Sequence, residues 1–249
     1  MATSIEISEQ AGVRYLHFGS RWVQGAMRIG RPYALELEYT RDMMLPLLLR
    51  EPRRWPRSVL LIGLGAASLT KFLYRHRPDA MLTVVEIASE VVAAATTYFR
   101  LPVDPARLTI EIGDGCDYVA ASRRRFDLVL VDGYDAKGRT GMLDTLPFYC
   151  NAYARLSDRG VLAVNLLSRS RGVSASLERA RQAFADRAVA LPQCASGNAV
   201  VLGAAGEPIT TTIEELRVAA RALKAATGLN LLPTIARLAA AQTGERFEL

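Results

Sequence analysis

The sequence contains few of the side chains that most often bind metals or carry out nucleophilic catalysis. Its two histidines, His17 and His76, stand in no motif with an acid or a nucleophile, which disfavours histidine-based catalysis. The three cysteines, Cys116, Cys150 and Cys194, are far apart, and this spacing disfavours a zinc cluster or a disulfide framework. We therefore expect no metal, and any acid–base chemistry falls to carboxylates, tyrosine or lysine.

Long apolar runs are also missing. No uninterrupted run approaches the roughly 20 residues that are needed to cross a bilayer. Residues 1–10 contain Glu6 and Glu9 and no apolar core of the kind that a secretory signal requires. These absences predict a cytoplasmic protein with no membrane partner.

The formal net charge of +6 raises the question of nucleic-acid binding. The positive residues, however, occur in short clusters at positions 53–57, 123–125 and 169–171, all in predicted connections. Neither interleaved aromatic residues nor a long basic stripe accompanies them. The pattern favours solvated loops over a nucleic-acid surface.

The first part of the chain indicates a small β unit followed by a helix. Residues 1–30 carry short alternating runs, the last of them Trp22-Val23-Gln24, and glycines separate these runs. Residues 33–50 have helical spacing of apolar side chains, with a break or kink expected at Pro46.

From residue 58 onward the pattern alternates between strand and helix. Strand cores such as the run from Phe126 to Val131 are continuously apolar, which is typical of strands buried on both faces of a parallel sheet. A late pair of strands would be antiparallel, and a helical tail from Thr212 to Ala241 would follow. We expect strands near 58–62, 82–86, 108–112, 127–131, 160–165, 188–191 and 198–204, and helices near 67–76, 89–99, 143–155 and 173–186.

These elements predict an α/β protein with a Rossmann-like, doubly wound sheet. The sheet is expected to be mostly parallel, with an antiparallel late strand and a small N-terminal β unit. We place the β unit and its connecting helix at residues 1–50, and the nucleoside-binding domain with its C-terminal helices at residues 51–249.

Ligands of open parallel sheets bind beyond the carboxyl ends of the strands. The first strand ends at Gly63 and Gly65, which allow a tight turn and a close backbone approach to a ligand. The third glycine of a dinucleotide motif is absent, so a plain strand–helix turn stays open as an alternative. The second strand ends at Glu86, where a carboxylate can accept hydrogen bonds from both hydroxyls of a ribose. A nucleoside-containing cofactor is therefore the first hypothesis.

Acids also follow the third and fourth strands. Asp114 lies between two glycines and can accept a hydrogen bond from an adenine amine, or it can cap a helix that starts at Cys116. Asp132 and Asp135 lie three residues apart in the next exit loop. One of them could take a proton from an incoming amine while the other orients that amine, although both could equally be turn residues.

The order of these motifs resembles the spermidine/spermine synthase (aminopropyltransferase) family, a branch of the class I methyltransferase-like fold. The GxG turn at 63–65, the acid at the tip of the second strand, the GDG at 113–115 and the D-x-x-D at 132–135 carry the resemblance. It extends to Val23-Gln24, Tyr39, Met43-Met44, Phe148-Tyr149, Gly160-Val161-Leu162 and Ser196-Gly197-Asn198.

The resemblance implies transfer of an aminopropyl group from decarboxylated S-adenosylmethionine to an amine or polyamine acceptor, with methylthioadenosine as product. Glu86 would hold the ribose, Asp114 the adenine, and Asp132 would deprotonate the acceptor amine for in-line attack. A homodimer or homotetramer is implied as well. The implied cofactor-binding residues are Gly63, Gly65, Glu86, Ile87, Asp114, Gly115 and Asp132, and the implied acceptor-binding residues are Gln24, Tyr39 and Asp135.

The first loop departs from the family pattern. Members of the family have G-G-G-D-G there, with an Asp that holds the aminopropyl ammonium, whereas residues 63–67 of this chain read Gly-Leu-Gly-Ala-Ala. The loss of that acid favours a methyltransferase that uses S-adenosylmethionine as the second hypothesis. A catalytically inactive nucleoside-binding homologue is the third.

Overall fold

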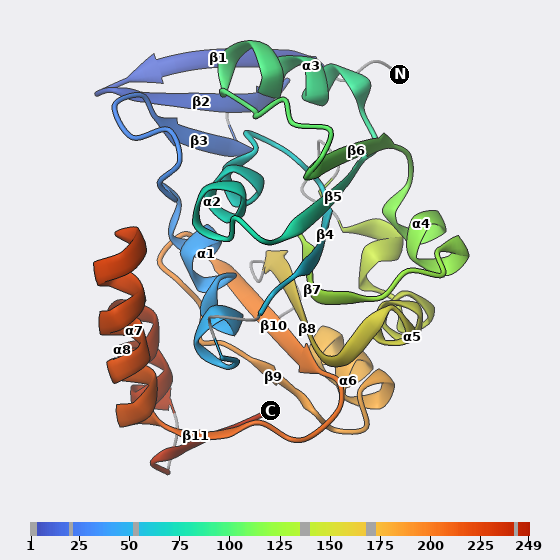
Figure 1. Ribbon diagram of the computed structural model, residues 1–249, viewed down its shortest axis with the longest axis vertical. Helices are drawn as coiled ribbons and strands as arrows, with labels where there is room; N and C mark the ends of the chain where they lie inside the picture. The colour runs from blue at the N-terminus through green and yellow to red at the C-terminus, as the bar shows by residue number, and fades with distance from the viewer. Residues whose placement is uncertain (1–3, 20–21, 52–54, 135–139, 168–172, 242–243) are drawn as a thin grey trace.

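A three-stranded antiparallel sheet caps one end of the molecule, at the top of Figure 1. The computed structural model describes residues 4–19, 22–51, 55–134, 140–167, 173–241 and 244–249. The small sheet contains β1 (Ile5–Gln10), β2 (Val13–Phe18) and β3 (Gly25–Arg28), and a helix α1 (Glu38–Asp42) and a 3-10 helix η1 (Leu45–Leu48) follow it.

A seven-stranded sheet forms the centre of the fold, in the order β6-β5-β4-β7-β8-β10-β9. The strands from β6 to β8 pair in parallel, and β10 pairs antiparallel with both of its neighbours. The predicted mostly parallel sheet with an antiparallel late strand is therefore confirmed. The bounds are β4 (Ser58–Ile62), β5 (Met81–Glu86), β6 (Leu108–Ile112), β7 (Phe126–Val131), β8 (Leu156–Leu167), β9 (Ala188–Ala190) and β10 (Asn198–Ala204).

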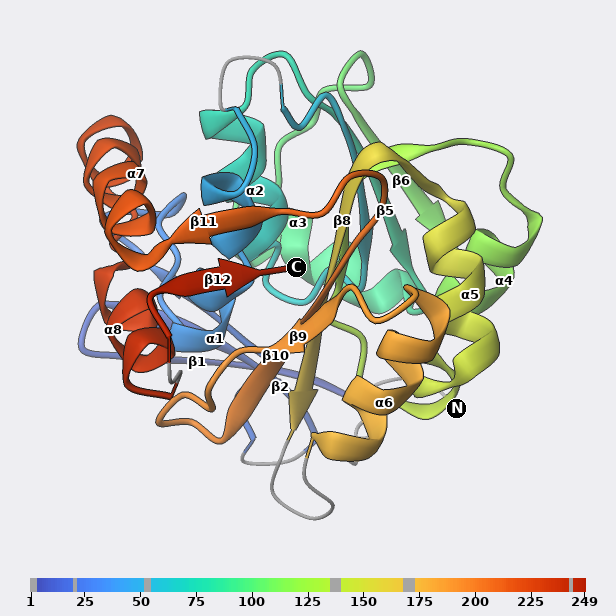
Figure 2. The ribbon, with the colours of Figure 1, turned by 90° about the horizontal axis from the view of Figure 1, so that it is seen from below.

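Helices cover both faces of this sheet, as the two ribbon views agree (Figures 1 and 2). One face carries α2 (Ser68–His76) and α3 (Ser89–Tyr98), together with α7 (Ile213–Thr227) and α8 (Leu232–Ala241) of the C-terminal part. The other face carries α4 (Gly115–Ala121), α5 (Leu146–Ala154) and α6 (Ser174–Ala183), with the 3-10 helix η2 (Gly141–Asp144) before α5. A two-stranded sheet of β11 (Thr210–Thr212) and β12 (Arg246–Glu248) closes the C-terminal part.

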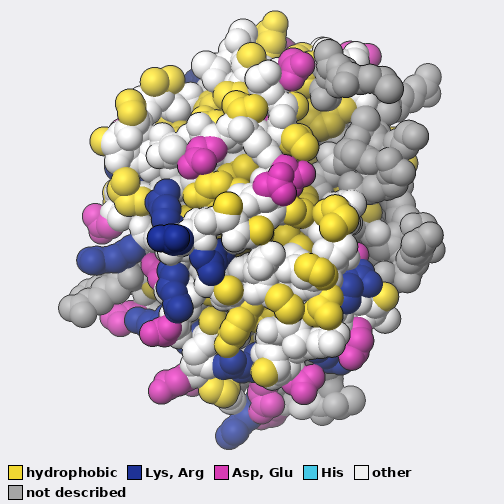
Figure 3. Space-filling view, turned by 90° about the vertical axis from the view of Figure 1, so that its right-hand side faces the viewer, with side chains coloured by type: hydrophobic (Ala, Val, Ile, Leu, Met, Phe, Trp, Pro, Cys, Tyr) yellow, Lys and Arg dark blue, Asp and Glu magenta, His cyan; other side chains and the backbone are white. Residues whose placement is uncertain are grey.

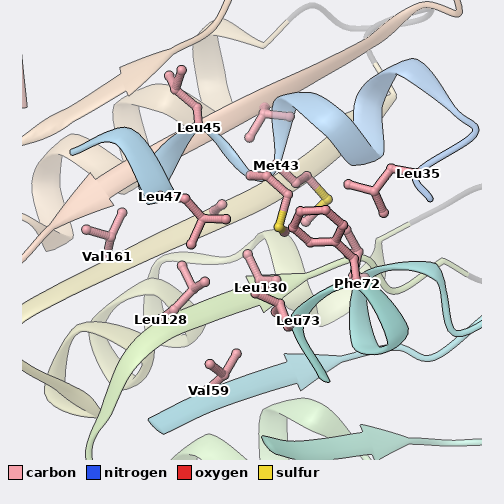
Figure 4. Close-up of a cluster of buried hydrophobic side chains, with 14 of the residues drawn as sticks. Leu35, Met43, Leu45, Leu47, Val59, Phe72, Leu73, Leu128, Leu130 and Val161 are labelled. Carbon is pink, nitrogen blue, oxygen red and sulfur yellow. The ribbon is translucent and has the colours of Figure 1, made fainter. Parts of the chain in front are cut away.

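Alternation along β4 divides its side chains between two cores. Val59 and Leu61 belong to the cluster under α2 and α7, whereas Leu60 and Ile62 belong to the cluster under α4 and α5. Figure 4 shows the first cluster, in which Met43 lies beside Phe72 above β7. Met43 comes from the segment between α1 and η1, so this connecting segment is packed into the core of the main sheet.

Several local predictions were wrong, each for a physical reason. The third N-terminal strand is Gly25–Arg28 rather than Trp22-Val23-Gln24, because its pairing with β2 begins at Gly25. The expected break or kink in the segment 33–50 is a break, but it lies before Pro46: α1 ends at Asp42, and Pro46 stands in the first turn of η1. β11 and β12 were missed because they pair across a long stretch of chain, and no local pattern reports such a pairing.

In the described ranges, no helix is long and apolar enough to cross a bilayer. On the face shown in Figure 3, the described Lys and Arg side chains form separate groups with Asp and Glu side chains between them.

One lysine of α2 is buried. Lys71 is 1% exposed, and its Nζ donates a hydrogen bond of 2.7 Å to the carbonyl oxygen of Phe99. Burial, and to a smaller extent the positive charge of Arg100, lowers the pKa of Lys71 to about 7. The folded protein therefore holds this proton less tightly than the unfolded chain does.

We expect Lys71→Met to flatten the dependence of stability on pH. The cost of burying the ammonium is fully present below the folded pKa of about 7 and disappears as the pH rises toward the unfolded value of 10.5. Wild-type stability thus gains up to about 1.4 kcal/mol per pH unit from this group across that window, and the variant lacks the gain. Urea unfolding of both proteins between about pH 7 and pH 10 measures the difference, and parallel curves would contradict the lowered pKa.

Candidate active site

The loops after β4 and β7 meet where the strand order of the sheet changes direction, which is the usual crevice for ligands in such sheets. Gly63 follows β4 with φ +90°, a conformation that side chains rarely adopt. A Cβ atom at Gly63 would overlap the backbone oxygen of Asp132. The glycine therefore allows the two loops to touch, and this contact places Asp132 at the carboxyl end of β4.

Two further glycines of the predicted site have equally clear steric reasons. Gly65 has φ +50°, and a Cβ there would lie 3.3 Å from the backbone oxygen of Gln24. A Cβ at Gly115 would overlap the side chain of Ile62, so glycine lets α4 begin close against β4. The turn that the sequence predicted after β4 is present, and its glycines lie close to the backbone of Asp132 and of Gln24.

A cavity of about 550 Å³ opens at these strand ends. Its volume falls in the range of sites for small organic ligands. Asp135 lies outside the described residues. The predicted site residues that line the cavity are Gln24, Tyr39, Gly63, Gly65, Glu86, Ile87, Asp114, Gly115 and Asp132.

The carboxylate of Glu86 is held in place at the tip of β5. It is 7% exposed, and it accepts hydrogen bonds from the backbone N–H of Leu64 at 2.8 Å and of Ala88 at 3.0 Å. Burial raises the pKa of Glu86, and the backbone N–H groups around it oppose that rise. The bond from Leu64 reaches Oε2 and the bond from Ala88 reaches Oε1, so the backbone orients both oxygens of the carboxylate.

Asp114 caps helix α4, as one of the two interpretations of the sequence required. Its Oδ1 accepts hydrogen bonds from the backbone N–H of Cys116 at 2.6 Å and of Asp117 at 3.4 Å. The same residue also lines the cavity. Both capping bonds go to Oδ1, so the cap does not use Oδ2. Capping α4 and binding a ligand in the cavity are therefore compatible roles for Asp114.

The carboxylate of Asp132 is oriented by one hydrogen bond to each oxygen. Asn165 Nδ2 donates to Oδ1 at 2.8 Å, and the Tyr39 hydroxyl donates to Oδ2 at 3.2 Å. Burial raises the pKa of Asp132 and the charge of Glu86 adds to that rise, whereas both hydrogen bonds lower it. A carboxylate that is oriented and whose pKa is raised is a stronger proton acceptor than one in water.

Asn165 and Asn198 extend this network; the sequence placed Asn198 only among the residues of the family resemblance and predicted no site role for either. Asn198 Nδ2 donates to Asn165 Oδ1 at 3.0 Å, and the Ser196 hydroxyl donates to Asn198 Oδ1 at 2.8 Å. Asn165 is 2% exposed and lies near the carboxyl end of β8. The available signal was a single polar residue inside an otherwise apolar run, from Val161 to Leu167.

Ala66 stands at the position that carries an acid in the family motif, and in this chain that position is buried. Ala66 is 2% exposed and belongs to a small core with Leu16, Met27 and Phe99. A Cβ at Gly25 would lie 2.6 Å from the Cβ of Ala66, so strand β3 runs directly against this residue. Ala66 therefore faces the N-terminal sheet, and the departure in the first loop is part of the packing between the two sheets.

Metal binding has no evident place in the described part of the chain. Within those ranges, no three His, Cys, Asp or Glu side chains are grouped closely enough to hold an ion.

Comparison with known proteins gives relatives of nearly full length. The polyamine aminopropyltransferase of Chromobacterium violaceum is 35% identical over 234 residues, which cover 94% of this chain and 88% of the relative. The protein of the same name from Neisseria meningitidis serogroup A is 32% identical over 247 residues, which cover 98% and 93%.

The fold and the family model agree with these relatives. A probable spermidine synthase from Corynebacterium glutamicum has a TM-score of 0.74 at 20% identity, covering 88% of this chain and 83% of that one. The family model described as the spermine/spermidine synthase domain matches residues 36–189, the stretch that supplies Tyr39, Glu86, Asp114 and Asp132 to the cavity. Because this model matches more than half of the chain and the two bacterial relatives match nearly all of it at 35% and 32% identity, the chain belongs to the spermine/spermidine synthase family.

Proposed function

We propose that this protein is a polyamine aminopropyltransferase, which transfers an aminopropyl group from decarboxylated S-adenosylmethionine to an amine acceptor and releases methylthioadenosine. The observation that carries the proposal is the presence of Glu86, Asp114 and Asp132 around one cavity of about 550 Å³. The relatives of nearly full length favour aminopropyl transfer over methyl transfer and over a function without catalysis.

The nucleoside end of the donor is assigned to the exits of β5 and β6. Glu86 would accept hydrogen bonds from the ribose hydroxyls, and the backbone N–H groups of Leu64 and Ala88 hold its carboxylate in place for them. Asp114 would accept from the adenine amine, and Ile87 and Gly115 lie beside these two acids in the cavity wall. The loop of Gly63 and Gly65 would let the backbone come close to the donor.

Asp132 is proposed as the general base. The nitrogen of a neutral amine attacks the carbon beside the sulfonium and forms the new C–N bond. The C–S bond breaks with its electron pair on sulfur, and the proton of the attacking nitrogen goes to Asp132. Tyr39 and Asn165 hold the carboxylate during this transfer, so positioning and one base supply most of the rate.

The acceptor is proposed to bind between the N-terminal unit and the sheet. Gln24 and Tyr39 line this side of the cavity, together with the apolar Trp22, Val23 and Leu37, whose side chains suit the methylene groups of an alkyl amine. Asp135 is proposed to bind the amine as well. On this division, residues 1–50 form the acceptor wall and residues 51–249 form the nucleoside-binding domain.

The identity of the donor is the sharpest test of the function. Because Ala66 replaces the acid that would bind the aminopropyl ammonium, methyl transfer from S-adenosylmethionine is the specific competitor. Calorimetric titration with decarboxylated S-adenosylmethionine, S-adenosylmethionine and methylthioadenosine compares the three ligands directly. Tight binding of the full cofactor together with weak binding of the decarboxylated one would remove aminopropyl transfer.

Assembly and location belong to the same proposal. We propose a homodimer or homotetramer in the cytoplasm, as the family resemblance implies. Sedimentation equilibrium of the purified protein measures the assembly, and a monomer at micromolar concentration would contradict it.

We expect Asp132→Asn to abolish most of the turnover and to spare donor binding. The amide has the shape of the carboxylate but cannot take the proton of the amine, and removing a general base costs about 100-fold to 10,000-fold in rate. Methylthioadenosine production measures turnover, and calorimetry with methylthioadenosine measures binding. Unchanged turnover would refute Asp132 as the base.

We expect Glu86→Gln to weaken the binding of methylthioadenosine by about 10-fold to 150-fold, because hydrogen bonds to a charged acceptor contribute about 1.5–3 kcal/mol. Glu111→Gln on the neighbouring strand β6 is the matched control, since Glu111 is exposed. Calorimetry at one salt concentration compares the three proteins. Equal affinity of wild type and Glu86→Gln would show that the ribose lies elsewhere.

A further inference from the structure

Helix α1 carries Tyr39 to the active site, yet it is too short to hold itself in place. It spans five residues, Glu38–Asp42, and its N-terminal cap residue makes no side-chain hydrogen bond. Isolated helices of this length are unstable in water, because the free-energy cost of nucleating a helix exceeds the stabilisation from the hydrogen bonds of a single turn. The position of the Tyr39 hydroxyl must therefore depend on contacts between α1 and other elements.

An arginine of the C-terminal helix α8 binds two acids of α1. Arg237 Nη1 lies 2.6 Å from Glu38 Oε1, and Arg237 Nη2 lies 2.6 Å from Asp42 Oδ2. Glu38 and Asp42 are one helical turn apart and so share a face of α1. Thr234 of the same helix α8 donates to Asp42 Oδ1 at 2.6 Å. Asp42 is 2% exposed, which makes these partners necessary to its charge.

Glu38 also joins α1 to the loop before β10. Its Oε2 accepts a hydrogen bond of 3.1 Å from the backbone N–H of Ala195. The next residues of that loop lead to Asn198, which is bonded to Asn165, and Asn165 donates to Asp132. Glu38 is thus connected to both residues that orient Asp132. It is the neighbour of Tyr39 in α1, and its bond to Ala195 fixes the loop that leads through Asn198 to Asn165.

We infer that Arg237 is a positioning residue of the active site, which acts through Glu38 and Asp42 to hold Tyr39 and the Asn198–Asn165 pair against Asp132. The inference rests on the proposed function, since it gives the C-terminal part of the chain a role in that reaction. The guanidinium suits the task because its planar fork reaches two carboxylates at once, whereas a lysine ammonium is a single point charge. Burial raises the pKa of Asp42 and the charge of Glu38 adds to that rise, whereas Thr234 and Arg237 both lower it.

The first experiment compares Arg237→Gln with a matched control in the same part of the chain. Arg221→Gln breaks the pair between Arg221 and Glu214, which lies within α7 and is exposed to solvent. For Arg237→Gln we expect kcat/KM for the acceptor amine to fall by about 100-fold, as displacement of a catalytic group by about 1 Å can cause. Affinity for methylthioadenosine is expected to stay that of wild type, because Glu86 and Asp114 are not part of the clamp that Arg237 forms with Glu38 and Asp42. The control is expected to match wild type in both. Equal kcat/KM in all three proteins overturns the inference.

A double-mutant cycle separates positioning from general loss of structure. If Arg237 acts through Tyr39, then adding Arg237→Gln to Tyr39→Phe costs clearly less than adding it to wild type. Fully additive losses in kcat/KM overturn the route through Tyr39. Should Arg237→Gln leave Asp42 too poorly compensated for the chain to fold, the pair Arg237→Gln with Asp42→Asn removes both charges and replaces the single variant in the cycle.

A third readout does not depend on turnover. Hydrogen exchange of the amides of residues 38–44 is expected to be at least about tenfold faster in Arg237→Gln than in wild type or Arg221→Gln, since local opening governs exchange. Wild-type protein that transfers no aminopropyl group to any amine would end the proposed function, while the exchange result would still decide whether Arg237 fixes α1. Unchanged exchange in Arg237→Gln overturns the clamp itself.

Discussion

The contact between the backbone at Gly63 and the backbone of Asp132 is the constraint on which the site depends. Two parallel strands, β4 and β7, end side by side at the point where the sheet order reverses, and glycine at position 63 lets their exit loops touch. The contact places the carboxylate of Asp132 at the same cavity that Glu86 lines from the end of strand β5. Holding these two acids charged would otherwise be costly, because burial raises the pKa of both and the charge of Glu86 raises the pKa of Asp132 further. Backbone N–H groups stabilise Glu86, and Tyr39 with Asn165 stabilise Asp132, so each charge has its own partners.

Most of the fold and the acidic part of the site could be predicted because they follow from local patterns. Continuous apolar runs identify buried parallel strands, and the residues after such strands meet at one edge of the sheet for geometric reasons. That reasoning brought Glu86, Asp114 and Asp132 together without any knowledge of contacts. It failed for Asn165 and Asn198, since a polar residue inside a buried strand shows its purpose only when its partner across the strands is known. The same limit hid β11, β12 and the clamp of Arg237, all of which depend on pairings between distant parts of the chain.

The departure at Ala66 is easier to understand beside Gly25. In this chain the first loop packs directly against strand β3, and the small side chains at both positions are what allow that contact. A carboxylate at position 66 would be buried against an apolar core, at a cost that an unpaired charge does not recover. The N-terminal sheet and the first loop therefore constrain each other, and the ammonium of a decarboxylated donor would have to be bound by acids at other strand exits. The acids in the described cavity wall are Glu38, Glu86, Asp114 and Asp132, and of these Glu86 is buried.

The net charge of +6 does not conflict with a cationic donor and acceptor. Surface charges are screened over roughly 8–10 Å at physiological salt, whereas charges in a partly buried cavity are screened far less. The field that a ligand meets is therefore set by Glu86, Asp114 and Asp132 in the cavity wall rather than by the arginines of distant connections. Glu38 also lines the cavity, but its charge is paired with that of Arg237. It therefore contributes to the shape of the acceptor wall more than to the electrostatic potential in the cavity. In the cavity wall, Glu86 and Asp132 are held by hydrogen bonds from neutral groups, whereas Glu38 is paired with Arg237 and belongs to the frame that positions Tyr39.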